Sequence, residues 1–410
     1  IDYDNVVKKL KSSGFTNTNG EGGVYSLKVQ PETLDPKTGQ FRTSYDFDKF
    51  RVEIQTMANI QEYCKTNDLK RLVDTRNGIE ILKKNDVYVN EESIRPAEFD
   101  DFNFRVTYKK EESVSKTGKV GNEIISNWNK SKKQFRYINR TTFQSPTSPI
   151  IIDLSVVRSS TSVNKQLIKT YNIDESNVFN NPEIYEIEVE IDTPKAKLAY
   201  GDNPEALVKE LESVIKVVLS GLQKTNYPVS YKEQDSVIAE YLSTLYEKDD
   251  NEKDDNEKDD NEKKIRTRAY PNNFIGPSSK TLQRKNISNI NPDINIPNVT
   301  EPFAFCVTDK ADGDRHLLYV NSIGKIYLIN TNMNVIFTGA RSEHKDCYNS
   351  IIDGELIIHN KNGTFINTYA AFDIYYINKT DVRARPFMKV PGKDDKFYEN
   401  CSFQVIKIQN

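Results

Sequence analysis

Residues 185–192, Tyr-Glu-Ile-Glu-Val-Glu-Ile-Asp, decide the fold of the first half of this 410-residue chain. Side chains alternate between the two faces of a β-strand, so Glu186, Glu188 and Glu190 share one face and the aliphatic residues between them pack on the other. Three carboxylates in a row repel one another unless positive charge lies opposite. On an exposed strand, water and salt supply the screening. Inside a barrel, a metal ion or basic side chains must supply it.

The surrounding sequence predicts an α+β domain built on antiparallel strands. Alternating apolar and polar residues predict strands at 24–29, 50–54, 104–109, 150–157 and 184–191, and helices are expected at 4–12, 60–67 and 204–225. Basic residues recur on or beside these strands: Arg51, Arg105, Lys109, Arg136, Arg140 and Arg158. An interior of glutamates and arginines is a poor core, but it suits a metal ion and phosphates.

The glutamate strand and the basic strands together resemble the triphosphate tunnel metalloenzymes, which hydrolyse the γ-phosphate of RNA 5′ ends inside a closed β-barrel. The runs FRVEI, IQEYCK, FRYINR and IDLSVVR, which begin at residues 50, 60, 135 and 152, resemble the triphosphatase part of large DNA virus capping enzymes. The resemblance implies that Mg²⁺ or Mn²⁺ is held by Glu186, Glu188 and Glu190. It implies that the triphosphate is held by Arg51, Arg105, Lys109, Arg136 and Arg158. Second-tier candidates for orienting water or basic residues are Glu53, Glu111 and Asp153.

Two features depart from that pattern. The family's first strand carries a second pair of glutamates, and no such pair precedes Asp4, so we expect that strand upstream of Ile1. Strict alternation also puts Asp153 and Arg158 on opposite faces, so at most one of them is central unless a bulge intervenes.

A second motif, Lys-Ala-Asp-Gly-Asp-Arg at 310–315, lies between apolar runs at 302–307 and 317–320. The spacing predicts a turn between two strands, and Asp-Gly is itself a turn former. A solvated hairpin turn would explain these residues equally well. A lysine nucleophile, by contrast, needs a desolvated pocket, cationic neighbours or a metal to lower its pKa from about 10.4.

Later segments favour the nucleophile. The pattern K-x-D-G-x-R resembles the covalent nucleotidyltransferases, the superfamily of mRNA capping enzymes and polynucleotide ligases. IIDGELI at 351–357, YAAFDI at 369–374 and PSSKTLQRK at 277–285 resemble further motifs of that superfamily in order and spacing. The resemblance implies that Lys310 carries the nucleotide as a phosphoramidate. The other nucleotide-binding residues that it implies are Asp312, Arg315, Glu355 and Asp373.

An acidic repeat separates the two halves. Residues 247–264 hold ten acids and five lysines, a net charge of −5 against −3 for the whole chain, and such a tract cannot bury apolar surface. We therefore expect a triphosphatase domain at 1–246, a linker at 247–264 and the first part of a guanylyltransferase domain at 265–410. The superfamily's later motifs are not found before Asn410, where 403–408 predicts a strand in progress.

Together the halves predict mRNA 5′ capping, in which γ-phosphate removal precedes GMP addition, with the RNA 5′ triphosphate end and GTP as substrates. Members of this family commonly carry a methyltransferase downstream and act in the viral factory or the virion. An ATP-dependent ligase, or an RNA 5′-end binding fragment without turnover, remains the alternative. The four scattered cysteines predict no zinc site, and without eighteen consecutive apolar residues we expect no membrane partner.

Overall fold

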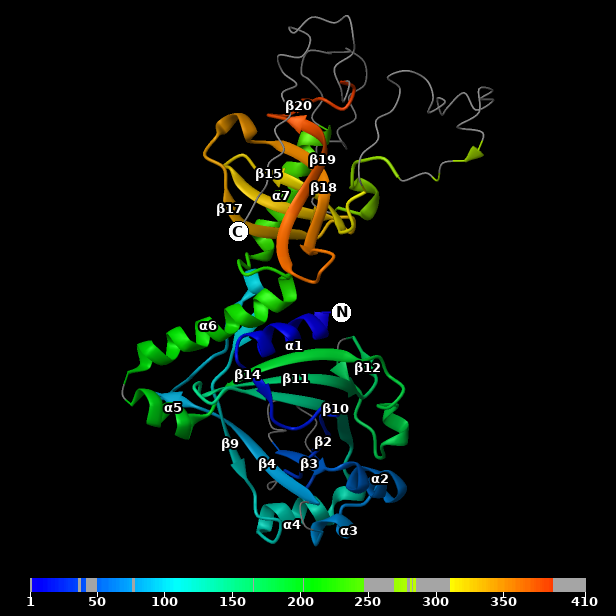
Figure 1. Ribbon diagram of the computed structural model, residues 1–410. Helices are drawn as coiled ribbons and strands as arrows, with labels where there is room; N and C mark the ends of the chain where they lie inside the picture. The colour runs from blue at the N-terminus through cyan, green and yellow to red at the C-terminus, as the bar shows by residue number, and fades with distance from the viewer. Residues whose placement is uncertain are drawn as a thin grey trace, which may run out of the picture. The chain divides into compact units, whose positions relative to one another are not determined.

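The computed structural model describes residues 2–35, 38–41, 50–75, 78–164, 166–201, 203–246, 269–278, 281, 283–284 and 310–385. These residues form two compact units that divide between Leu222 and Gln223 (Figure 1). This division precedes the expected boundary at residue 246, and helix α7 (Tyr231–Tyr246) packs on the sheet of the second unit. The expected linker at 247–264 lies outside the described residues.

The first unit is built on an antiparallel sheet with the strand order β14-β11-β10-β2-β3-β4-β9, and β1 also pairs with β10. The strands are β1 (Thr16–Asn17), β2 (Val24–Pro31), β3 (Phe50–Gln55), β4 (Ile79–Asp86), β9 (Lys109–Ser113), β10 (Lys133–Gln144), β11 (Ile150–Ser159) and β14 (Ile184–Ile191). The strands predicted at 24–29, 50–54, 150–157 and 184–191 are confirmed.

Helices cover the apolar face of this sheet. Helices α1 (Asp2–Ser12) and α6 (Pro204–Gln223) pack on β10 and β11, around the buried side chains of Phe143 and Ile152. Helices α2 (Met57–Thr66), α3 (Lys70–Val73) and α4 (Lys119–Ser126) pack on β2, β3 and β4. The helices predicted at 4–12, 60–67 and 204–225 are confirmed. Burial of one face by helices leaves the other face to the charged side chains.

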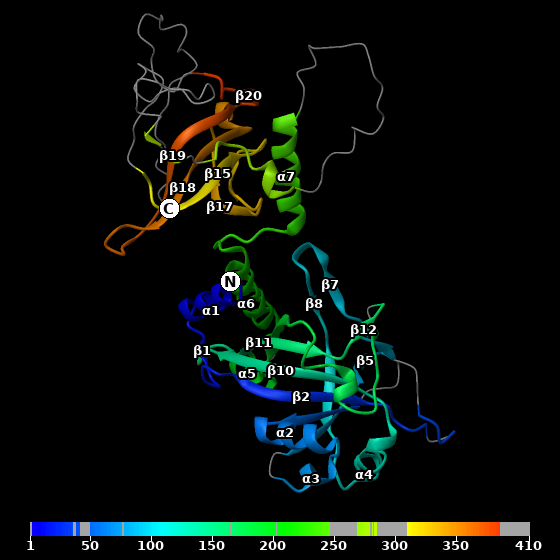
Figure 2. The same cartoon turned by 90° about the vertical axis from the view of Figure 1, so that its right-hand side faces the viewer.

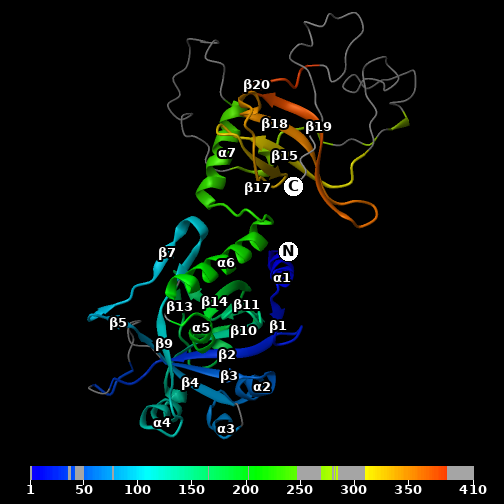
Figure 3. The same ribbon diagram turned by 60° about the vertical axis from the view of Figure 1, so that its left-hand side comes forward.

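The sheet curls around its polar face (Figure 3). Strands β14 and β9 are the two ends of the strand order, yet the charge of Glu111 on β9 contributes to raising the pKa of Glu190 on β14. Within the described residues, β14 and β9 do not pair with each other. A closed tunnel thus stays a prediction, and the sheet that the structure shows is a curled, open one.

The single strand predicted at 104–109 is wrong. Strand β8 (Phe104–Val106) pairs with β7 (Ala97–Phe99) in a separate hairpin, and β9 begins only at Lys109 (Figure 2). The rings of Phe99 and Phe104 stack at 4.7 Å and hold this hairpin together. The short hairpin of β5 (Tyr88–Val89) and β6 (Glu92–Ser93) belongs to the same excursion from the sheet.

Smaller elements complete the first unit. A hairpin of β12 (Ser162–Val163) and β13 (Gln166–Leu167) follows β11. Helix α5 (Thr193–Tyr200) begins directly after the glutamate strand, because the Asp192 side chain accepts a hydrogen bond of 3.1 Å from the Lys195 amide. This cap fixes where β14 ends.

The second unit holds an antiparallel sheet in the order β17-β16-β15-β18-β19-β20. The strands are β15 (Asp314–Val320), β16 (Lys325–Asn330), β17 (Val335–Arg341), β18 (Ser350–His359), β19 (Phe365–Ile377) and β20 (Thr380–Asp381). Helix α7 covers one face, where Tyr241 packs against Tyr319. The strands expected at 302–307 and 403–408 lie outside the described residues. No helix in the described part of the chain is long and apolar enough to span a membrane.

Candidate active sites

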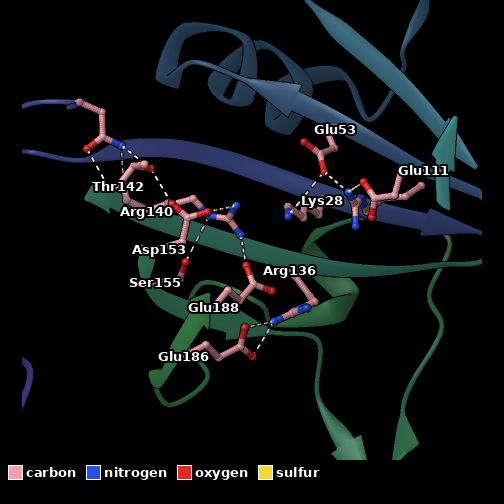
Figure 4. Close-up of polar contacts among 12 residues, drawn as sticks. Lys28, Glu53, Glu111, Arg136, Arg140, Thr142, Asp153, Ser155, Glu186 and Glu188 are labelled. Atoms are coloured by element: carbon pink, nitrogen blue, oxygen red, sulfur yellow. Dashed lines mark hydrogen bonds and ion pairs between the residues drawn. The ribbon is translucent and has the colours of Figure 1, made fainter. Parts of the chain in front are cut away.

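Arg140 on β10 is the centre of the polar face of the first unit (Figure 4). Its guanidinium donates to Asp153 on β11 at 2.8 Å, to the Ser155 hydroxyl at 3.3 Å, and to Glu188 on β14. Thr142 donates to the second oxygen of Asp153 at 2.7 Å. The strand register explains the arrangement, because Asp153 lies opposite Thr142 on one side and Glu188 on the other. Sequence reasoning included Arg140 among the basic strand residues but gave it no role.

Three carboxylates meet at this point. Asp153, Glu188 and Glu190 each offer an oxygen, and these atoms lie within 4.8 Å of one another. Hard oxygen donors grouped in this way suit Mg²⁺ or Mn²⁺. The group differs from the predicted set, since it takes Asp153 from the neighbouring strand in place of Glu186.

Glu190 shows that the cluster carries more negative charge than its protein partners balance. Although Glu190 is exposed at its residue surface, the partial desolvation of its carboxylate, followed by the charges of Glu188 and Asp153, raises its pKa above the usual range. Arg140 lowers it, but not enough to offset them. A bound cation would remove this repulsion, so the residues present fit a divalent metal.

Glu186 has a different environment, although it shares the face of Glu188. Arg136 on β10 donates to both oxygens of Glu186 at 2.6 Å. Each side chain is a little over one third exposed. The predicted ligand Glu186 and the predicted triphosphate ligand Arg136 therefore neutralise each other, beside the carboxylate cluster.

The far side of the same face is also rich in ion pairs (Figure 4). Arg51 bonds Glu53 at 2.7 Å and Glu111 at 3.2 Å, and Lys28 lies 3.5 Å from Glu53. Burial lowers the pKa of Lys28, and the nearby Arg51 and Arg140 lower it further. The structure thus brings the predicted Arg51, Glu53 and Glu111 together, and it adds Lys28, which the sequence gave no reason to choose.

Three other predicted triphosphate ligands are placed differently. Arg105 is exposed on the β7–β8 hairpin, off the main sheet, because the chain leaves that sheet after β4. Arg158 lies on the opposite face from Asp153, where it donates to the Phe179 carbonyl and, at 2.8 Å, to Glu183. Lys109 does lie on the sheet, paired with Asp86. The structure therefore does not bring Arg105 and Arg158 to the polar face that carries the carboxylate cluster.

In the second unit, the segment 310–313, which begins with Lys310, is fixed to the neighbouring strand through Gly313. The amide of Gly313 donates to Glu355 on β18 at 2.9 Å. Gly313 packs so closely that a Cβ at this position would lie 2.6 Å from the Leu356 carbonyl oxygen. Lys310 and Asp312 are exposed beside this contact. Glu355 therefore positions the predicted nucleophile through the backbone of its turn.

Arg315, the last residue of the motif, is occupied by protein partners. It donates through Nε and Nη2 to the two oxygens of Asp353, at 3.1 and 2.6 Å, and through Nη1 to the Pro277 carbonyl at 2.9 Å. It also lies over the Phe274 ring, 5.4 Å from its centroid. We expected Arg315 to bind a ribose or a phosphate. In the structure it instead ties residues 274–277 to the sheet.

Asp353 and Asp373 lie side by side on β18 and β19. Asp353 is fully buried, and it also accepts a hydrogen bond from the Tyr375 hydroxyl. Burial, followed by the charge of Asp353, raises the pKa of Asp373, which is half-buried. Sequence reasoning placed Asp373 in the site and quoted Asp353 only as part of a motif. The pairing of Asp353 with Asp373, which brings Tyr375 within reach of Asp353, is a matter of strand register that residue order does not reveal.

Comparison with known proteins finds similarity to mRNA capping enzymes. Residues 253–390 match the family of the mRNA capping enzyme catalytic domain. Over 401 residues the chain is 25% identical to a probable mRNA-capping enzyme of Acanthamoeba polyphaga mimivirus. That similarity covers 93% of this chain but only 28% of the length of the mimivirus protein.

Proposed function

We propose that this protein acts in mRNA 5′ capping, and that its second unit transfers GMP through Lys310. The observation that supports the proposal is the hydrogen bond of 2.9 Å from the Gly313 amide to Glu355, which anchors the backbone three residues after Lys310 within the segment that matches the capping catalytic domain. A preorganised nucleophile lowers the barrier because its orientation is set before the substrate binds.

The reaction has two balanced steps. The Lys310 amine bonds to the α-phosphorus of GTP as the bond to the bridging oxygen breaks, so that pyrophosphate leaves and the amine loses a proton. A terminal phosphate oxygen of a diphosphate-ended RNA then bonds to the same phosphorus. The phosphorus–nitrogen bond breaks, and Lys310 recovers its proton and returns as the free amine.

Labelling tests this assignment. The protein is incubated with GTP or ATP labelled at the α-phosphate, and acid-stable and acid-labile protein label are compared. We expect acid-labile label from GTP that is lost in Lys310→Ala and kept in Lys345→Ala, an exposed lysine at the other end of β18. Label from ATP in place of GTP would instead favour a polynucleotide ligase.

For the first unit we propose removal of the RNA γ-phosphate. The support is the cluster of Asp153, Glu188 and Glu190 on a face that also carries Arg140, Arg51 and Lys28. Mg²⁺ or Mn²⁺ held by the three carboxylates would polarise the γ-phosphate. Arg140, Arg136 and Arg51 would hold phosphate oxygens after exchanging their carboxylate partners for the substrate.

Phosphate release from triphosphate-ended RNA tests this second activity. We expect release by the full-length protein and its loss in Glu188→Gln, while Glu183→Gln, on the chain just before β14, keeps it. RNA binding without phosphate release by the full-length protein would favour an RNA 5′-end binding role for this unit.

A further inference from the structure

The β18–β19 hairpin extends past the turn that carries Lys310. Strand β15 pairs with β18 only up to the pair Asp314–Leu356, whereas β18 and β19 continue to pair as far as His359 and Phe365. Residues 357–368, which we call the arm, therefore project beyond Asp314, the first residue of β15 (Figure 2). Three residues of strand beyond Leu356 carry the arm about 10 Å past the start of β15.

The arm begins beside Gly313, three residues after the proposed nucleophile. Residues 310–313 precede β15, so they lie on the side toward which the arm projects. Gly313 confirms this proximity, since a Cβ built on it would meet the Leu356 carbonyl oxygen at 2.6 Å and Ile357 at 3.1 Å. An RNA whose end reaches Lys310 from this side would therefore pass beside the arm.

The tip of the arm is ordered by its own hydrogen bonds. The Asn360 side chain accepts from the amides of Asn362 and Thr364, each at 2.9 Å, and the Asn360 amide donates to the Thr364 carbonyl at 2.9 Å. Gly363 adopts a φ of +76°, which a side chain would disfavour. A tip fixed in this way presents its side chains with little ordering cost on binding.

The exposed side chains of the arm suit a single-stranded nucleic acid. Phe365 is 67% exposed, and its ring lies edge-on to His359 with the centroids 5.8 Å apart. Lys361 is exposed at the tip. In a chain in which 29% of residues are charged, no acid occurs from Leu356 to Phe372. Aromatic faces stack on bases, while a lysine without acidic neighbours attracts the phosphate backbone.

We infer that the arm binds the single-stranded 5′ segment of the RNA that accepts GMP, with Phe365 stacking on a base and Lys361 contacting a phosphate. The inference rests on the proposed transfer of GMP from Lys310. A protein partner or a second copy of the chain is a less suitable occupant, because Phe365 and Ile366 are the exposed large apolar side chains of the arm, and two residues among polar amides do not make a broad apolar patch.

The test separates the two acceptors of the lysyl-GMP intermediate. Full-length protein is charged with labelled GMP and then discharged, in single turnovers, either by pyrophosphate or by a diphosphate-ended RNA of about 20 nucleotides. Phe365→Ala should lower the ratio of the RNA rate to the pyrophosphate rate by about fivefold to a hundredfold, the range expected for loss of one stacked base. Phe365→Trp should keep the ratio of the RNA rate to the pyrophosphate rate close to that of the unaltered protein. Lys361→Ala should weaken RNA binding and lower the dependence of binding on salt by about one ion.

Ile323→Ala is the matched control, since Ile323 is half-exposed on the turn at the opposite end of β15 and should leave the ratio unchanged. An unchanged ratio in both arm variants would overturn the inference. An equal fall in the rates of discharge by RNA and by pyrophosphate would overturn it too, as would a change in oligomeric state alone. Absence of lysyl-GMP in the unaltered protein would instead contradict the proposed function, so the two failures can be told apart.

Discussion

Arg315 and Asp353 form a two-point ion pair between neighbouring strands, with Nε–Oδ1 and Nη2–Oδ2 distances of 3.1 and 2.6 Å. The Asp353 side chain is 1% exposed and that of Arg315 is 28% exposed. Burial and the Asp353 charge raise the pKa of Tyr375, so its hydroxyl keeps its proton and donates to the same carboxylate. The motif arginine is thus held by a buried carboxylate that Tyr375 holds in turn.

Asp353→Asn should lower the free energy of unfolding of the second unit by about 3 kcal/mol, because it leaves the partly buried guanidinium without its counter-charge. Chemical denaturation followed by fluorescence measures the change. Asp381→Asn is the control, since its partner Arg383 and Asp381 itself are both nearly half exposed, and it should cost less than about 1 kcal/mol. Equal losses would contradict a special role for the buried pair.

Gly276→Ala should disturb the same network from the other side. Gly276 has a φ of +128°, and an added Cβ would lie 2.5 Å from Nη2 of Arg315 and 2.7 Å from the Tyr375 hydroxyl. We expect a fall in stability and slower lysyl-GMP formation. Gly363→Ala is the matched control, because its φ is +76° but nothing lies within 4 Å of the added Cβ. If the two variants behave alike, backbone strain alone explains the effect.

Metal binding should distinguish Glu186 from the carboxylate cluster. Glu188→Gln and Glu190→Gln should weaken Mn²⁺ binding to the first unit more than Glu186→Gln does, because Arg136 already neutralises Glu186. Titration followed by electron paramagnetic resonance gives the affinities. A larger loss of Mn²⁺ affinity in Glu186→Gln would instead support the metal ligands predicted from the glutamate strand, which include Glu186.

Stability without metal should depend on pH through Glu190. Because its pKa is raised in the folded protein, its ionisation favours the unfolded state. Glu190→Gln should therefore be more stable than the unaltered protein at pH 7, and the difference should shrink as the pH falls below the raised pKa toward 4. Melting temperatures at several pH values, with a chelator present, measure it. A difference that does not change with pH would show that the carboxylate is not the cause.

A bound metal ion should make the ionised form of Glu190 favourable in the folded protein. Since a divalent cation binds the ionised form of Glu190, Mn²⁺ affinity should increase with pH until the carboxylate is fully ionised. Calorimetry in two buffers of different ionisation enthalpy should detect protons released on binding. Glu190→Gln should release fewer protons than Glu183→Gln, which serves as the exposed control.

Local patterns predicted the parts of the fold that depend on one strand at a time. Alternation identified β14 and its glutamate face, and it also put Asp153 and Arg158 on opposite faces, as the register confirms. It failed at 104–109. The residues there alternate, but β8 pairs with β7 in a hairpin outside the main sheet. Strand pairing, rather than the pattern within one strand, decides which face a residue shares.

The parts of the sites that the sequence did not predict depend on distant partners. Arg140 owes its central place to the pairing of β10 with β11 and of β11 with β14, which no local pattern encodes. Asp353 reaches Tyr375 because β18 and β19 pair with Asp353 opposite Asp373. Helix α7 was not predicted. It packs against the second sheet and belongs to the second unit, which begins at Gln223.

The excursion between β4 and β9 has a consequence for engineering. Asp86 and Lys109 are paired in register and joined by an ion pair, so residues 87–108 leave the sheet and return to it at a single point. The segment is therefore a module that a tight two-residue turn can replace without changing the order of the strands. Its deletion would leave the carboxylate cluster intact, and its site would accept a foreign domain or a fluorescent reporter.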